Sequence, residues 1–182
     1  MREAVIVSYA RTGMAKANRG SLNDTHGITM AGHAIKSAID RAGIEAGLIE
    51  DVFLGTAQPE GATGHNVARN AALWAGCPST TSGATVNRFC SSGLQAIAMA
   101  AHSVINEGAP AAIGGGVESL SLVSRSGHMN TFRYTEEELM KKWPAIWMTM
   151  IETAEIVADP RWPEAGILWR HGRQGRQVRH RW

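Results

Sequence analysis

Cys90 is the residue best suited to covalent chemistry, and it lies in the segment Thr85-Val86-Asn87-Arg88-Phe89-Cys90-Ser91-Ser92-Gly93-Leu94-Gln95-Ala96. The pattern around it predicts the junction of a strand and a long helix. At a helix N-terminus, the free backbone N–H groups and the positive end of the helix dipole favour an anion, so a thiolate forms there more readily. The small residues that follow would leave room for a thioester to reach the sulfur. We therefore predict that Cys90 is a nucleophile.

The other cysteine, Cys77, stands beside Pro78 in a predicted loop. We interpret it as a small buried hydrophobe, which is the usual role of an unpaired cysteine. The two cysteines form no Cys-x-x-Cys pattern, and no His pair accompanies them at zinc-ligand spacing. We therefore expect two free thiols, no metal site and a reducing compartment, the cytoplasm.

Alternating strands and helices must position Cys90. Apolar runs predict strands at 4–9, 51–57, 83–89 and 111–117, and helical spacing predicts helices at 28–42, 66–75 and 94–105. Asp24 or Thr25 is expected to cap the first helix and Gly43 to end it. This alternation implies right-handed βαβ units, so the predicted class is α/β with a mainly parallel sheet flanked by helices.

The pattern changes after residue 118. We expect a surface excursion with a short charged helix, and then a helix over 149–158 that Pro160 ends. Residues 160–182 carry six Arg and one Glu, whereas residues 1–159 carry 12 Lys and Arg against 15 Asp and Glu. This Arg- and Trp-rich tail is expected to be foreign to the fold. No apolar run approaches the length of a membrane span, and the acidic start does not match a signal peptide.

Four ordered segments resemble the thiolase family, the acetyl-CoA acyltransferases and acetyltransferases. Val86–Gln95 resembles the nucleophile motif, and Ala10-Arg11-Thr12-Gly13 resembles the Arg-Thr-Pro element with Gly13 in place of Pro. Gly114–Ser121 resembles Gly-Gly-x-Glu-Ser-Met-Ser, and Met148–Glu155 resembles Met-Gly-x-Thr-Ala-Glu. The resemblance predicts an amino-terminal α/β domain over 1–118, the start of a substrate-covering loop region over 119–159, and the tail over 160–182.

The resemblance implies acyl transfer through a thioester on Cys90, either thiolysis of a 3-ketoacyl-CoA or Claisen condensation. Acyl-CoA and CoA would be the partners, with no cofactor, no nucleic acid and a homo-oligomer. Met150 is a candidate for the substrate pocket, whereas Glu118 is interpreted as a structural, hydrogen-bonded carboxylate. Arg88 and His128 are expected at the surface, without an assigned role.

The family's second, similar half carries a Gly-His-Pro histidine, an Asn-Glu-x-Phe segment and a later Cys-x-Gly cysteine. None of these motifs occurs in the 182 residues, and Cys77 precedes Cys90 instead of following it. We therefore expect a truncated chain, the amino-terminal half alone, with little activity of its own.

Two other functions remain open at this point. The first is a non-catalytic acyl-CoA-binding or scaffolding module with a thiolase-like fold, since a fold can host a site or lack it. The second takes the Arg-rich tail as a surface for nucleic acid or another polyanion, which ranks low because its arginines show no periodicity. Acylation of Cys90 by acyl-CoA separates the enzyme from the binding module.

Overall fold

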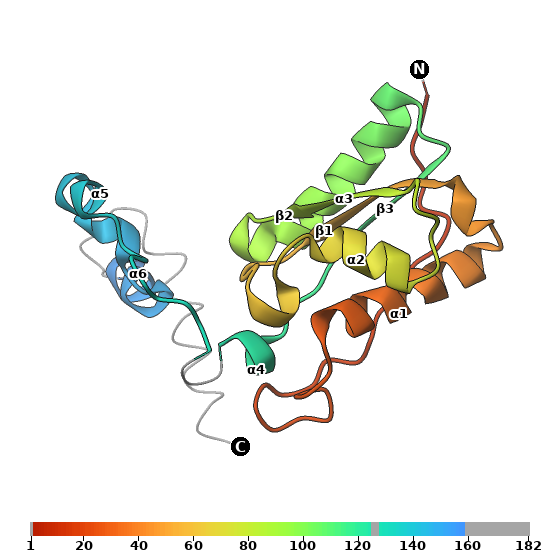
Figure 1. The fold of residues 1–182 in the computed structure, drawn as a ribbon. Helices are drawn as coiled ribbons and strands as arrows, with labels where there is room; N and C mark the ends of the chain where they lie inside the picture. The colour runs from red at the N-terminus through yellow and green to blue at the C-terminus, as the bar shows by residue number, and fades with distance from the viewer. Residues whose placement is uncertain (1, 125–127, 159–182) are drawn as a thin grey trace. The chain divides into compact units, whose positions relative to one another are not determined.

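A computed structural model describes residues 2–124 and 128–158 of the chain. The chain divides into two compact units, Met1–Asn130 and Thr131–Trp182. The first unit is an α/β layer structure, which confirms the predicted class (Figure 1). The predicted tail at 160–182 lies outside the described residues, and the domain boundaries at 118 and 159 remain predictions.

Three parallel strands form the sheet, in the order β2-β1-β3. They are β1 Ile49–Gly55, β2 Ser82–Val86 and β3 Ala111–Gly116, so three of the four predicted strands are confirmed within a few residues. Gly55 at the end of β1 is in register with Val86 of β2 and with Gly116 of β3. The carboxyl ends of the three strands therefore meet at one edge of the sheet.

Helices cover both faces of this sheet (Figure 1). Helices α1 Gly27–Ala42 and α2 Val67–Trp74 pack with Val52 and Leu54 of β1 in one apolar cluster. Helix α3 Ser92–His102 packs on the other face against Phe53. Successive side chains of a strand point to opposite faces of the sheet. Val52 and Leu54 therefore face α1 and α2 while Phe53 faces α3, and β1 is apolar on both faces.

The residues next to its two ends determine where helix α1 begins and ends. Gly43 ends it with φ 65°, a left-handed conformation that glycine adopts readily, as predicted. The predicted cap is wrong, however, because His26 precedes the helix and its Nδ1 accepts from the Ile28 N–H at 3.2 Å. The N-cap is thus His26, one residue after Thr25.

The remaining elements are short. In the first unit they are the 3₁₀ turns η1 Ala46–Leu48, η2 Gly61–Thr63 and η3 Phe89–Ser91, the π-helical turn η4 Ser103–Glu107, and α4 Leu120–Val123. The second unit holds α5 Glu137–Lys142, η5 Pro144–Trp147 and α6 Met150–Val157. The short charged helix and the helix expected at 149–158 are thus confirmed. None of the helices in the described ranges is long and apolar enough to cross a membrane.

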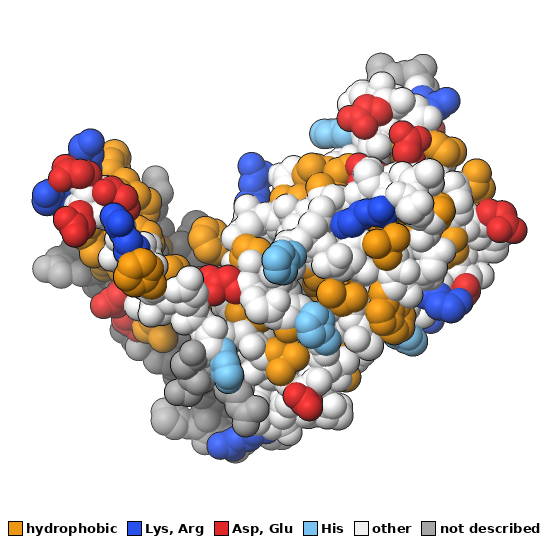
Figure 2. Space-filling model, viewed as in Figure 1, with side chains coloured by type: hydrophobic (Ala, Val, Ile, Leu, Met, Phe, Trp, Pro, Cys, Tyr) orange, Lys and Arg blue, Asp and Glu red, His pale blue; other side chains and the backbone are white. Residues whose placement is uncertain are grey.

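The strand predicted at Ala4–Tyr9 is wrong. Residues 2–16 form no regular secondary structure, and Val5, Ile6 and Val7 are 75%, 83% and 72% exposed. A strand requires a neighbour to accept and donate its backbone hydrogen bonds, and among the described residues β3 pairs only with β1. Apolar side chains also reach the surface at several other places on the face shown in Figure 2.

Glycines bring α3 close to the sheet. A Cβ built on Gly55 would lie 2.3 Å from the Ser92 carbonyl carbon, and one on Gly114 would lie 2.6 Å from the Ile97 Cα. Both neighbours are backbone atoms, so no side-chain rotation could relieve the overlap. The strands of this sheet therefore need glycine wherever α3 crosses them closely.

We predict that Gly55→Ala destabilises the first unit, by about 1–3 kcal/mol or more, because α3 must move away from β1. Thermal or denaturant unfolding measures the change. The matched control is Gly13→Ala, where a Cβ meets no atom within 4 Å, and we expect a change within about 0.5 kcal/mol. Equal stability of the two variants would contradict this account of the packing.

Candidate active site

The candidate site lies at the edge where the three strands end. Val86 ends β2, Asn87 and Arg88 follow, and the turn η3 leads directly into α3 at Ser92. Cys90 is the middle residue of that turn, and it is exposed. The predicted strand-to-helix junction at Cys90 is therefore present, with a 3₁₀ turn inserted between the two elements. Ligands of open α/β sheets bind at this edge of the strands.

The backbone at this turn has an unusual conformation. Phe89 has φ 47°, in the left-handed region that residues other than glycine rarely adopt. Its side chain is 73% exposed, so packing of the ring does not hold it there. Such a conformation persists only where the surrounding structure fixes it. Hydrogen bonds on both sides of Phe89 supply that constraint.

Two polar side chains fix the turn. The Asn87 Oδ1 accepts from the Phe89 N–H at 2.9 Å, which is the geometry of an Asx turn. The Ser92 Oγ accepts from the Arg88 N–H at 2.9 Å and donates to the Phe89 carbonyl at 2.5 Å. Ser92 is buried, so it clamps the turn from inside while Cys90 projects from it.

Glu118 joins the ends of the strands. Its Oε1 accepts from the Thr56 hydroxyl at 3.1 Å and its Oε2 from the Ala57 N–H at 2.7 Å. The Ala57 carbonyl in turn accepts from the Asn87 Nδ2 at 3.3 Å. A chain of hydrogen bonds thus runs from Glu118, two residues after β3, through Ala57, two residues after β1, to the turn that carries Cys90. This supports the interpretation of Glu118 as a structural carboxylate.

The two thiols occupy opposite environments. Cys77 is 5% exposed, and burial raises the pKa of its thiol, although nearby Arg69 and a hydrogen bond with Thr81 act in the other direction. Cys77 therefore stays protonated at neutral pH and is confirmed as a buried residue. Cys90 is open to solvent.

The other residues singled out in the sequence lie elsewhere. Met150 opens α6 in the second unit and is 80% exposed, and its place in a substrate pocket stays a prediction. The Arg88 Nη1 donates to the Gln95 Oε1 at 2.6 Å, while His128 is exposed. Gly114 serves the approach of α3 to β3. Across the described ranges, no group of three His, Cys, Asp or Glu side chains could hold a metal ion.

Sequence reasoning missed the two residues that shape the turn. From sequence alone, Asn87 and Ser92 have no assigned role beyond membership of the motif and, for Ser92, a small side chain. In the structure, both make hydrogen bonds that hold the backbone at Phe89. An Asn two residues before a turn residue is a recognised signal for an Asx turn, and it could have been read from the sequence. The contact between Asn87 and Ala57 spans 30 residues and carries no local signal.

A family comparison matches the chain over residues 4–157 to "Thiolase, N-terminal domain". Among curated proteins, a 3-ketoacyl-CoA thiolase of Bacillus subtilis is 44% identical over 158 residues, which is 87% of this chain and 40% of that protein. An acetyl-CoA acetyltransferase of Rhizobium meliloti is 37% identical, over 69% of this chain and 31% of that protein. The chain therefore spans less than half the length of these relatives.

Among solved structures, the crystal structure of the Bacillus anthracis acetyl-CoA acetyltransferase matches with a TM-score of 0.71 and 29% sequence identity. The match covers 87% of this chain and 42% of that one.

We predict that iodoacetamide modifies Cys90 at least about tenfold faster than Cys77 at neutral pH, because only Cys90 is exposed and the buried thiol stays protonated. Modification of Cys77 should become appreciable only as the pH rises, since its pKa is raised. Peptide mapping by mass spectrometry over a pH series measures both rates. Faster modification of Cys77 in the folded chain would contradict the arrangement described.

We also predict that Glu118→Ala destabilises the first unit by about 1–2 kcal/mol, because the Ala57 N–H and the Thr56 hydroxyl lose their acceptor. Glu118→Gln is the matched control, since its amide can accept from the Ala57 N–H and donate to the Thr56 Oγ. Denaturant unfolding compares the two. The reverse order, with Gln the less stable variant, would mean that the charge rather than the hydrogen bonds matters.

Proposed function

The chain belongs to the thiolase family, and from this premise we propose that it is the nucleophile-bearing part of an acyl-CoA acyltransferase. Its substrates are CoA thioesters, and the reaction is thiolysis of a 3-ketoacyl-CoA or, in the opposite direction, Claisen condensation. The observation that carries the proposal is the exposed Cys90 at the junction of β2 and α3, on a turn that Asn87 and Ser92 fix.

The chemistry follows from that geometry. With acetyl-CoA, the Cys90 Sγ attacks the thioester carbonyl as a thiolate; the new S–C bond forms as the bond to the CoA sulfur breaks, and CoA leaves as a thiol after gaining a proton. With a 3-ketoacyl-CoA, the thiolate attacks the 3-keto carbonyl instead; the bond between C2 and C3 breaks, and acetyl-CoA leaves after its C2 gains a proton. We propose that the Cys90 N–H, at the start of the helical segment, donates to the carbonyl oxygen as negative charge develops on it. A rigid turn keeps these groups in place during the reaction.

Turnover requires acid–base groups that deprotonate the thiol, protonate the leaving CoA and abstract an α-proton. The side chains that fix the backbone of the Cys90 turn are Asn87 and Ser92, neither of which is a base. We therefore propose that a polypeptide of these 182 residues acylates slowly and turns over little. Met150 remains our candidate for the acyl or pantetheine pocket.

The exposed side chains beside Cys90 and the two free thiols bear on the oligomeric state and the cellular compartment. Phe89 and Leu94, on either side of Cys90, are 73% and 72% exposed, and exposed apolar side chains beside a site favour a protein interface. We propose a homo-oligomer that covers them. The two free thiols fit a reducing compartment such as the cytoplasm.

We predict that acetoacetyl-CoA or acetyl-CoA adds one acetyl group to Cys90. Intact-mass spectrometry and peptide mapping detect it. Cys90→Ser should abolish the adduct, and Cys77→Ala should retain it. Cleavage of acetoacetyl-CoA by these residues alone should be at least about 10²-fold slower than when the remainder of a relative is added, because positioned proton transfer is worth at least that much.

The outcomes separate the alternatives. Binding of acetyl-CoA without acylation would favour a non-catalytic acyl-CoA-binding module of the same fold. Full turnover by the 182 residues alone would contradict the need for further acid–base groups. Acylation of the Cys90→Ser variant would show that the nucleophile is elsewhere.

A further inference from the structure

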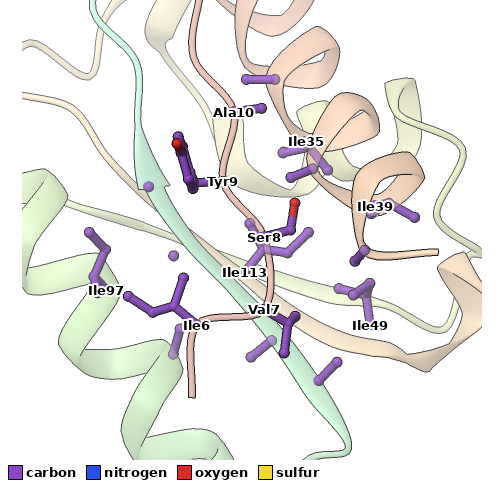
Figure 3. Close-up of a pocket in the computed structure, with 18 of the residues that line it drawn as sticks. Ile6, Val7, Ser8, Tyr9, Ala10, Ile35, Ile39, Ile49, Ile97 and Ile113 are labelled. Atoms are coloured by element: carbon purple, nitrogen blue, oxygen red, sulfur yellow. The ribbon is translucent and has the colours of Figure 1, made fainter. Parts of the chain in front are cut away.

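The connection between α2 and β2 covers the second thiol. It runs over residues 75–81, and Cys77 within it is 5% exposed, whereas Ser79 lies at the surface. The Cys77 side chain belongs to the apolar cluster of β1, α1 and α2, together with Ile35, Ile39 and Ile49. Figure 3 shows these three isoleucines beside the apolar cavity between β3 and residues 4–10. Cys77 is thus a nucleophilic group that the proposed reaction does not use, held beneath a loop.

Both ends of this loop are fixed by the backbone. Gly76 follows the end of α2 with φ 94°, in the left-handed region. Ser82 begins β2, which is paired with β1 from that residue on. A Cβ built on Gly83 would lie 2.7 Å from the Arg69 backbone nitrogen, so β2 is packed closely against α2 there. Residues 77–81 therefore form a short strap between two fixed points.

Hydrogen bonds from outside the strap hold it closed. The Arg69 guanidinium donates through Nη2 to the Ser79 carbonyl at 2.8 Å and through Nη1 to the Thr81 carbonyl. The Thr81 hydroxyl donates to the Ile49 carbonyl of β1 at 2.8 Å, in a buried position. A guanidinium holds its donors in a rigid planar fork. The single side chain of Arg69 therefore binds two carbonyls of the strap at once.

The strap is less firmly held than the elements on either side of it. Arg69 starts from the first turn of α2, where its N–H donates to the Asn66 Oδ1 at 3.1 Å. Within the strap, the buried side chains are those of Cys77 and Thr81. Segments with few buried side chains open locally at a lower free energy than global unfolding requires. Opening of the strap needs only the loss of the contacts made by Arg69, Thr81 and Cys77.

We propose that the strap opens locally and that Arg69 is the clasp that keeps it closed, so that Cys77 reacts with small disulfides only in the open form. In that reaction, the Cys77 thiolate attacks one sulfur of the disulfide, which is the oxidant. A new S–S bond forms as the old one breaks, and the second sulfur leaves as a thiolate and takes up a proton. The added group has no space in the close-packed cluster, so the strap stays open afterwards.

Arg69 acts on Cys77 in two opposite ways. Burial raises the pKa of the Cys77 thiol, and the positive charge of Arg69 lowers this pKa. Loss of the charge alone would leave less thiolate and slow the reaction. Loss of the clasp opens the strap more often and speeds the reaction. The sign of the change therefore distinguishes a clasp from a nearby charge.

The experiment uses the 182-residue chain with Cys90→Ser, which leaves Cys77 as its single thiol. The probe is dithiodipyridine, a small disulfide that is uncharged at neutral pH, and the absorbance of the released thiopyridone gives the rate. Arg69→Met keeps an apolar stem without the donors, and it should raise the rate at least about tenfold. Arg69→Lys keeps the charge without the fork, and it should raise the rate at least about threefold.

Arg41→Met is the matched control. The Arg41 Nη1 also donates to a backbone carbonyl, that of Tyr9 at 2.8 Å, but this carbonyl lies outside the strap. The rate at Cys77 should therefore change less than about twofold.

Urea separates local opening from global unfolding without any change at Arg69. Opening of the strap exposes little surface, and the dependence on urea follows the surface exposed. Well below the unfolding transition, the rate at Cys77 should therefore be almost independent of the urea concentration.

Three outcomes would overturn the proposal. The first is a slower reaction in Arg69→Met with an unchanged rate in Arg69→Lys, which would leave Arg69 as a charge alone. The second is a rate that rises with urea along the full slope of global unfolding. The third is equal acceleration by Arg69→Met and Arg41→Met. None of these measurements involves acylation of Cys90, so their failure is distinguishable from that of the proposed function.

Discussion

The structure depends on the close approach of the start of α3 to the carboxyl end of β1. Gly55 permits it, since a single added methyl would overlap the Ser92 backbone. That approach seats Ser92 under the turn, where its hydroxyl holds the backbone on both sides of Phe89. The exposure of Cys90, and the strained turn that presents it, follow from this one packing constraint.

The carboxyl edge of the sheet differs from its border along β3. At the carboxyl edge, hydrogen bonds among Glu118, Ala57 and Asn87 tie the ends of all three strands to the nucleophile turn. On the side of β3, an apolar cavity separates the last strand from a segment that has the sequence of a strand but no strand partner. The fixed turn and the apolar cavity therefore lie at different parts of the same sheet.

In the part of the second unit that the structure describes, two helices begin at local caps. Helices α5 and α6 contain no buried residue, and each begins at a cap made by its own neighbours. The backbone N–H groups of Glu138 and Leu139 lower the pKa of the Glu136 carboxyl, and the backbone N–H and hydroxyl of Thr149 lower the pKa of the Glu152 carboxyl. At a pH above the unfolded-state pKa of these carboxyl groups, both are ionised and stabilise the helix caps. This stabilisation is lost as the pH falls through the lowered pKa that each group has in the folded chain.

The sequence by itself determined the elements whose signals are local. Periodicity located β1, β2, β3 and the three long helices, Gly43 marked the end of α1, and the segment around Cys90 predicted the strand-to-helix junction. Only the tertiary structure decided what depends on distant partners. Ala4–Tyr9 has a strand's sequence but lacks a paired neighbour, and Glu118 reaches Ala57 across 61 residues. Apolar period and turn chemistry are properties of neighbouring residues, whereas backbone pairing and close helix approach exist only once remote segments meet.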